Sequence, residues 1–407
     1  MTVALGVVPV VLLLLGFPIF VVLLSAVTVA LVFYMNIPLA ALHQNLFGAI
    51  DVFALLAVPY FVYAGELMAR GSVAARIVDV VQRGIGAVRG SLGVTVVGTS
   101  AIFGAICGAS AAAVATIGKI TLPAMRGAGY PERFSAGLVT AVGAIDVIIP
   151  PSIPLIVYGI AAQESVPRLY AAGILPGLLI AALLAMYVVW YARRNGIGAG
   201  TAFRLPVFAR ALGRGLWALG APVIILGGIY GGVFSPTEAA GVACVYAVLV
   251  TRFVYRELGW RDIVEAAAAT VLFTGQVLII VACANVFSWL LTVNQVPATL
   301  VAWLEALEVS RWTLLALINL GLLVVGCVLD PLSAILLLSP LLVPVVKAAG
   351  IDTVHFGIVL TVNLAIGLFT PPFGINIFVA QSALGLRLGV IYRGIDRKST
   401  RLNSSHS

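Results

Sequence analysis

The chain consists of long apolar runs separated by short polar or basic segments. Apolar stretches of about 20 residues, the length at which a helix crosses a bilayer, recur roughly ten or eleven times when interrupted ones are counted. The first run continues from the N-terminus to Tyr34 without a basic leader, so we expect no cleavable signal peptide. The pattern predicts an all-α, multi-pass membrane protein.

A second pattern is an internal repeat. Residues 122–159 recur as residues 343–380 without a gap, each residue 221 positions before its counterpart. Pro150-Pro151 falls on Pro371-Pro372, and a further proline and a glycine also coincide. Two double prolines in a fixed register indicate a duplicated unit.

The charges of equivalent segments predict that the two copies face opposite ways. Residues 70–90 carry four arginines and one aspartate, whereas 291–311 carry two glutamates and one arginine. The linker 193–215 has five arginines and no acid. By the positive-inside rule, 70–90 and the linker lie in the cytoplasm and 291–311 lies outside. The alternative is a parallel duplication, with both arms on one side.

Each copy also contains an apolar run that is long for one span and short for two. Residues 91–122 and their counterpart 312–343, which is interrupted at 329–334, fit a re-entrant hairpin or one long kinked helix. We predict a first repeat at 1–192 (scaffold helices 1–69, interfacial arm 70–90, hairpin 91–123, broken helix 133–160), a basic cytoplasmic linker at 193–215, a second repeat at 216–394 (arm 291–311, hairpin 312–346, broken helix 354–385), and a disordered or non-native polar tail at 395–407.

Composition narrows the function classes. The chain is 62% hydrophobic and 9% charged, and its net charge of +8 is spread over short loops, which argues against a nucleic-acid partner and for a lipid bilayer. Four cysteines without CxxC spacing and three scattered histidines suggest no metal site. The ATP-binding GxxxxGK[ST] loop is missing from the sequence. We expect no enzyme activity and no cofactor.

The double prolines suggest the chemistry. Each proline removes a backbone donor, and an unpaired carbonyl in hydrocarbon costs several kcal/mol unless something binds it. Sodium takes oxygen ligands, and the half-helix after the break presents free N–H groups to an anion. The candidate site groups are Gly108, Ala109 and Ser110 at the first tip, Ser152 after the first break, Asp330, Pro331 and Ser333 at the second tip, and Asn363, Thr370 and Asn376 around the second break; the substrate candidates among them are Ser110, Ser152, Asn363, Thr370 and Asn376.

Three acidic residues have different interpretations. Asp330 is either a cation ligand or the cap of the second half of its hairpin. Asp146 has no acidic counterpart, because Gly367 stands at its position in the second repeat. It is a proton site, a pathway residue or a peculiarity of this sequence. Glu66 is expected to pair with Arg70, four residues on.

At this point the motifs resemble the large membrane subunit of the tripartite ATP-independent periplasmic (TRAP) transporters. The resemblance covers the chain from about residue 5 to about residue 385. The segments that carry it are AGELM (64–68), GASAA (108–112), PAMRGAGY (123–130), IIPPSIPLIVYG (148–159), SPTEAA (235–240), LDPLSAILLLSPLLVPV (329–345) and HFGIVLTVNLAIGLFTPPFGINIFVA (355–380).

The resemblance implies inverted repeats with a mobile transport domain that works as an elevator against a scaffold. It implies sodium-coupled uptake of a small organic anion across the bacterial inner membrane. Its partners would be a small four-helix membrane subunit and a periplasmic substrate-binding protein. Carried over by motif, the sodium positions are Gly108, Ala109 and Ser110, Pro150 to Ser152, Asp330, Pro331 and Ser333, and Thr370 with Pro371.

The resemblance also implies one more hydrophobic helix after Gly394, where this sequence becomes polar. One alternative function is a stand-alone sodium/anion symporter of the same superfamily. Another is a channel or an assembly protein. Channels usually repeat a pore loop around a symmetric ring, whereas the symmetry here lies within one chain.

Overall fold

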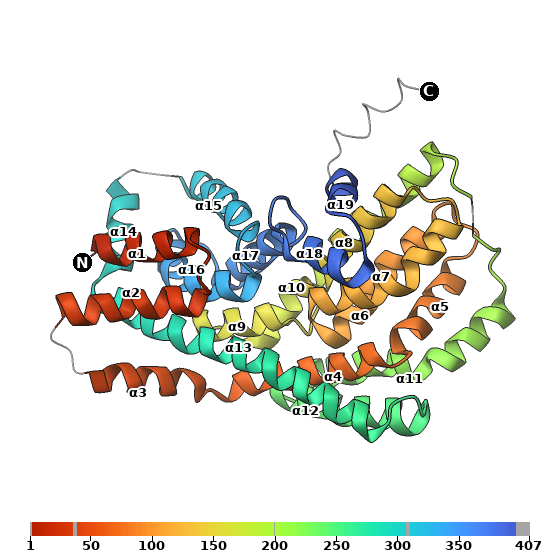
Figure 1. Ribbon diagram of the computed structural model, residues 1–407, viewed down its shortest axis with the longest axis horizontal. Helices are drawn as coiled ribbons and strands as arrows, with labels where there is room; N and C mark the ends of the chain where they lie inside the picture. Colours follow the sequence, from red (N-terminus) through yellow and green to blue (C-terminus); the bar gives the residue numbers. More distant parts are fainter. Residues whose placement is uncertain (1, 36–38, 199, 307–309, 396–407) are drawn as a thin grey trace.

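The computed structural model describes residues 2–35, 39–198, 200–306 and 310–395, and all regular elements in these ranges are helical (Figure 1). The predicted tail from residue 396 on lies outside them, as do residues 307–309 of the second predicted arm. The elements up to the linker are α1 (Thr2–Leu14), α2 (Ile19–Tyr34), α3 (Leu39–Ile50), η1 (Phe53–Leu56), α4 (Ala57–Arg70), α5 (Val73–Ile85), α6 (Ser91–Cys107), α7 (Ser110–Gly127), α8 (Glu132–Ile148), α9 (Ile153–Ala162) and α10 (Val166–Arg194). After it come α11 (Leu205–Tyr230), α12 (Pro236–Val248), the π-helical turn η2 (Leu249–Val254), α13 (Trp260–Val293), α14 (Val296–Ala306), α15 (Arg311–Gly326), α16 (Pro331–Ala348), α17 (Thr353–Gly367), α18 (Ile375–Leu384) and α19 (Leu388–Ile395).

The helices of the two halves correspond at the spacing of the sequence repeat. Moved by that spacing, the bounds of α7 coincide with those of α16, the start of α8 with that of α17, and the start of α9 with the residue before α18. The arm helices α5 and α14 lie at opposite ends of the molecule (Figure 1). The predicted all-α fold of two inverted repeats is confirmed.

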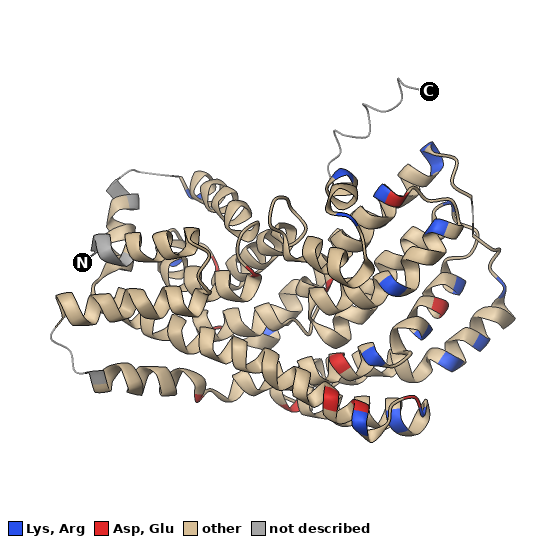
Figure 2. Cartoon of the chain, viewed as in Figure 1, with Lys and Arg blue, Asp and Glu red and all other residues tan. Residues whose placement is uncertain are grey.

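Positive charge gathers at one end of the molecule. Lys and Arg side chains lie mainly on the right in Figure 2, on α5, on α11 and where α7 and α10 end, whereas the opposite end, around α14 and the start of α3, has few. This asymmetry is the one that the positive-inside rule expects of a multi-pass protein.

The number of single helices that could each span a membrane is smaller than the number of apolar stretches counted in the sequence. Among the described residues, six helices are long and apolar enough, or seven if α8 and α9 count as one span bent by 42°. The difference arises because the hairpin arms and the half-helices stop part-way. α6, α15, α17 and α18, for example, are apolar but only 10–17 residues long.

The scaffold helices of the two repeats differ. α13 runs for 34 residues without a break, a length of about 50 Å. Its counterpart in the first repeat is interrupted between α3 and α4, where the short 3-10 helix η1 replaces regular α-helix. α13 packs against α2, α3, α4 and α16, so it lies between the scaffold and the second hairpin.

The first break follows from the backbone chemistry of proline. Proline disfavours the helical region for the residue before it, and Ile149 is extended, with φ −70° and ψ 126°. The Ser152 hydroxyl then caps α9 by accepting a hydrogen bond from the Leu155 N–H at 3.3 Å. The second break is longer and occupies residues 368–374. Both Pro-Pro peptide bonds are cis.

The hairpins and broken helices of the two repeats interlock. α9 packs on α16 of the other repeat, α18 packs on α7, and α8 crosses α17. Each broken helix therefore uses the opposite hairpin as part of its packing surface. We call α6–α9 together with α15–α18 (residues 91–162 and 311–384) the interlocked core.

Candidate functional site

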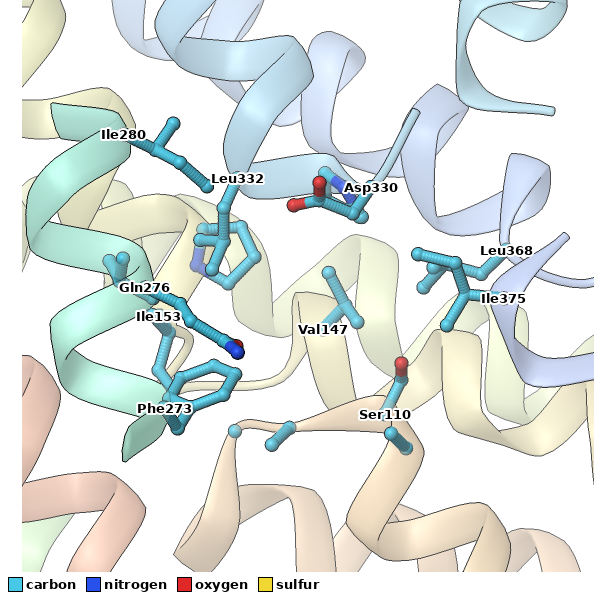
Figure 3. A pocket seen from close by; sticks show the side chains of 16 residues that line it. Ser110, Val147, Ile153, Phe273, Gln276, Ile280, Asp330, Leu332, Leu368 and Ile375 are labelled. Carbon is cyan, nitrogen blue, oxygen red and sulfur yellow. The ribbon is translucent and has the colours of Figure 1, made fainter. Parts of the chain in front are cut away.

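A cavity of about 320 Å³ lies where both hairpin tips, both helix breaks and α13 meet (Figure 3). Its lining residues are Gly108, Ala109, Ser110 and Ala111 from the first tip, Val147, Ile153 and Pro154 from the first break, Asp330, Pro331 and Leu332 from the second tip, Leu368 and Ile375 from the second break, and Phe273, Gln276, Val277 and Ile280 from α13. The structure thus brings together residues that lie hundreds of positions apart in sequence.

Four helices begin at this cavity. The first residues of α7, α9, α16 and α18 are Ser110, Ile153, Pro331 and Ile375, and all four line it. A helix N-terminus carries unpaired N–H groups and about half a positive charge. The convergence therefore makes the cavity favourable for an anion.

Three polar side chains reach the cavity from different sides. In Figure 3 the Ser110 hydroxyl, the Gln276 amide and the Asp330 carboxylate face the space between the tips and α13, and apolar side chains make up most of the remaining wall. Asp330 also caps α16, because its carboxylate accepts a hydrogen bond from the Ser333 N–H at 3.0 Å. The capping interpretation is confirmed, and the carboxylate still borders the cavity.

The first tip is tied to the second break by a side-chain bridge. The Ser110 hydroxyl donates to Asn376 Oδ1 at 3.0 Å, and Asn376 Nδ2 donates to the Thr140 carbonyl on α8 at 3.3 Å. Asn376 is fully buried. Two predicted site residues from different repeats therefore act as one hydrogen-bonded unit next to the cavity.

Other predicted residues lie outside the cavity lining. The Ser152 hydroxyl donates to the Val147 carbonyl, and the Thr370 hydroxyl donates to the Ile366 carbonyl in the last turn of α17 at 2.7 Å. The Asn363 amide donates to Asn319 Oδ1 at 2.6 Å, on α15. Ser333 is nearly fully buried, and its hydroxyl has no partner among the described residues. Two of the predicted prolines, Pro150 and Pro371, likewise do not line the cavity.

The double prolines lead us to expect unpaired carbonyls at Asp146, Val147, Gly367 and Leu368. This expectation is wrong for three of the four. The Val147 carbonyl accepts from Ser152. The Gly367 carbonyl accepts from the Thr370 N–H within the second break, and the Leu368 carbonyl accepts from the Asn376 N–H in the first turn of α18, each at 3.0 Å. Donors close to each break therefore replace those that proline removes: a hydroxyl just after the first double proline, a backbone N–H just before the second, and a backbone N–H at the start of α18.

Gln276 is a cavity residue that sequence reasoning missed. It lies inside the long helix α13, and its counterpart in the first repeat is the buried Leu55. The repeat therefore gives no hint of it. The available signal was an amide in the middle of a membrane span, where polar groups tend to be functional.

The sequence of the chain matches a family model along nearly its whole length. Residues 7–395 match the model described as "Tripartite ATP-independent periplasmic transporter, DctM component". The chain belongs to the DctM family. DctM proteins are the large permease subunits of TRAP transporters, as the names of the relatives state.

Curated relatives in the DctM family are named for different substrates. The isethionate TRAP transporter permease DctMQ of Oleidesulfovibrio alaskensis is 40% identical over 87% of this chain and 56% of its own length, so this chain spans just over half of it. The C4-dicarboxylate large permease DctM of Pseudomonas aeruginosa is 38% identical, covering 87% of this chain and 83% of its own. The ectoine/5-hydroxyectoine large permease UehC of Ruegeria pomeroyi is 37% identical, over 95% and 90%.

A solved structure shares the fold of this DctM chain. The YdaH transporter of Alcanivorax borkumensis superposes with a TM-score of 0.65, over 96% of this chain and 95% of that one. The sequence identity is 16%, so the likeness concerns the fold alone.

Proposed function

We propose that the chain is the permease subunit of a sodium-coupled transporter that imports a small organic anion of the carboxylate class across the bacterial inner membrane. A periplasmic binding protein would deliver the anion, and a small four-helix membrane subunit would complete the complex. The observation that carries the proposal is the cavity at which four helix N-termini meet an aspartate, between the interlocked core and α13.

The cavity suits a small carboxylate. Four positive helix ends surround it, and the Ser110 hydroxyl and the Gln276 amide can donate hydrogen bonds to carboxylate oxygens. The apolar walls, from Phe273 to Ile280 on one side and Val147 on the other, would exclude water around the bound molecule. Of the predicted substrate contacts, Ser110 has the most direct access, and Asn376 supports it.

Sodium would balance the charge of the anion at the same place. Asp330 supplies a carboxylate, and the tips at 108–110 and 330–332 would supply further oxygens. The hydroxyl of Ser333, which has no partner among the described residues, lies next to the second tip but outside the cavity lining. A cation and an anion bound side by side in a low dielectric attract each other strongly, so each raises the affinity for the other. This mutual dependence is the physical basis of coupled transport.

Alternating access would move one wall of the cavity past the other. One wall belongs to the interlocked core and the other to α13, so an elevator-type displacement of the core would carry the bound pair across. In this proposal, repeats at 1–192 and 216–394 share the core, and the basic linker 193–215 stays in the cytoplasm.

The test is uptake by proteoliposomes that contain the chain with the small membrane subunit and the binding protein encoded with it. Uptake of the acid carried by that binding protein is expected only with an inward sodium gradient. Asp330→Asn keeps an N-cap but removes the charge, so it should abolish sodium dependence or uptake. Glu265→Gln, which removes an exposed carboxylate from α13, should leave both unchanged. Full uptake without sodium would refute coupling, and full uptake without the binding protein would favour the stand-alone symporter.

A further inference from the structure

Asp146 is a fully buried acid that the proposed transport cycle does not use. It lies on α8, four residues before Pro150, and none of its surface is exposed. Its Oδ1 lies 2.7 Å from the Ser100 hydroxyl oxygen, and its Oδ2 has no hydrogen-bond partner among the described residues. An ionised carboxylate with a bare oxygen is very costly inside a membrane protein.

The facing surface of α6 is shaped to receive this side chain. Ser100 and Gly104 are one helical turn apart on α6, and both face Asp146. A Cβ atom on Gly104 would lie 2.7 Å from the Asp146 Cα and 2.9 Å from Oδ1. Only glycine lets α6 approach so closely, while Ser100 provides the polar contact.

The Ser100 hydroxyl can form hydrogen bonds with both Asp146 and the Val142 carbonyl at the same time only if the Asp146 carboxyl is protonated. The Ser100 hydroxyl oxygen lies 2.7 Å from Asp146 Oδ1 and 2.9 Å from the Val142 carbonyl, but it has one proton to donate. A neutral Asp146 donates to Ser100, which then donates to Val142. An ionised Asp146 would take the only proton of Ser100 and still leave Oδ2 as an unpaired anionic oxygen.

Among the described residues, no Lys, Arg or His side chain forms a hydrogen bond or ion pair with Asp146. α8 packs against α6, α7, α9, α10, α17, α18 and α19. The titratable side chain of α6 is the Cys107 thiol, which is an acid and cannot supply positive charge. Titratable groups on the other neighbouring helices include Lys119, Tyr158, Tyr170, His355 and Tyr392, and none of these five is given a hydrogen bond or ion pair with Asp146 among the described residues.

We propose that Asp146 is a proton-binding site of the interlocked core and that the bound proton lets α6 pack against α8. The step is the simple addition of a proton from water to the carboxylate, which yields a neutral carboxylic acid. The site is separate from the cavity at the hairpin tips, and it does not depend on the proposed sodium coupling. Sodium bound at Asp146 is the competing occupant.

The first test compares the thermal unfolding of the purified chain with that of Asp146→Asn over a range of pH. Asparagine can mimic the neutral acid, because its amide donates to Ser100. Since the folded chain holds a proton that the unfolded chain releases, wild-type stability should fall as pH rises, by up to about tenfold in the folding equilibrium per pH unit relative to Asp146→Asn. The control Glu132→Gln removes an exposed carboxylate from the same helix and should follow the wild type. Parallel curves for wild type and Asp146→Asn would overturn the proposal.

A second measurement covers the case in which Asp146→Asn does not fold. The infrared spectrum of the wild-type chain at neutral pH should contain the C=O band of a protonated carboxyl, and Ser100→Ala should shift that band because it removes the hydroxyl contact. A spectrum without the band would show that Asp146 is ionised and would refute the proposal. Loss of the band on adding sodium chloride would assign the site to sodium instead.

Discussion

Gly108→Ala is expected to destabilise the chain by disturbing the contact between the first hairpin tip and the first helix break. Gly108 has φ +60°, which is the left-handed region. A Cβ at this position would lie 2.4 Å from the Pro151 carbonyl oxygen and 3.5 Å from the Ile153 backbone nitrogen. Both neighbours are backbone atoms, so rotation of a side chain cannot relieve the overlap.

Two costs add up at this position. Placing a residue with a Cβ in the left-handed region costs roughly 1–2 kcal/mol, and forcing apart closely packed atoms costs typically about 1–3 kcal/mol. Together they predict a loss of about 2–5 kcal/mol. Gly129 separates the two terms, because its φ is +79° and nothing lies within 4 Å of its added Cβ. Gly129→Ala should therefore lower the free energy of unfolding only by the conformational cost of the left-handed backbone.

The assay is thermal unfolding of the detergent-solubilised chain, followed for wild type and both variants under the same conditions. We expect the wild type to have the highest apparent melting temperature, Gly129→Ala a lower one and Gly108→Ala the lowest. If the tip rests on the break as described, the gap between the two variants reports the overlap with Pro151. Equal melting temperatures for the two alanine variants would refute the reasoning.

The remaining predictions concern two other junctions. Burial raises the pKa of the Glu257 carboxyl, but hydrogen bonds from the Ser72 N–H at 2.7 Å, the Ser72 hydroxyl and Arg76 at 3.0 Å outweigh it and hold that pKa below its ordinary value. The stabilisation by these bonds is thus present at neutral pH and is lost as the pH falls through the lowered pKa. Glu257→Gln should reduce the melting temperature at pH 7 and should make the melting temperature fall less steeply as the pH is lowered. The same dependence on acid pH in the variant and the wild type would contradict this prediction. Tyr158→Phe removes a buried hydrogen bond of 2.6 Å from the Tyr158 hydroxyl to the Thr353 carbonyl. It should lower the free energy of unfolding by about 1 kcal/mol, as measured by thermal unfolding. A variant as stable as the wild type would contradict this prediction.

The sequence predicted the parts of the fold that depend on local chemistry and on the repeat. Proline at 331 begins α16, and the Pro150-Pro151 pair ends α8 two residues earlier, as expected from the missing donors. The same spacing predicted the second hairpin and the second broken helix from the first. Local rules sufficed here because a helix end in hydrocarbon has few alternatives.

The sequence could not predict which distant groups meet. Asn363 looked like a site residue, but it bonds to Asn319 on the neighbouring helix α15. Gln276 is one polar residue in a long apolar segment, and nothing in the sequence shows that it lines the cavity. In both cases the outcome depends on how helices from different parts of the chain cross, and hydropathy or spacing along one helix contains no such information.

The two boundaries around the cavity differ in the interactions that hold them. Within the interlocked core, directional bonds cross between the repeats, such as Ser110 to Asn376 and Tyr158 to Thr353. Among the described residues, no hydrogen bond joins α13 to that core, and most of what α13 offers the cavity is apolar. Apolar contacts are non-directional and exchange one partner for another at little cost, whereas a buried hydrogen bond must be broken before its groups move. Displacement is therefore easier along α13 than between the repeats. Gln276 is the polar group that α13 presents to the cavity, so such a movement would bring it next to different residues of the core.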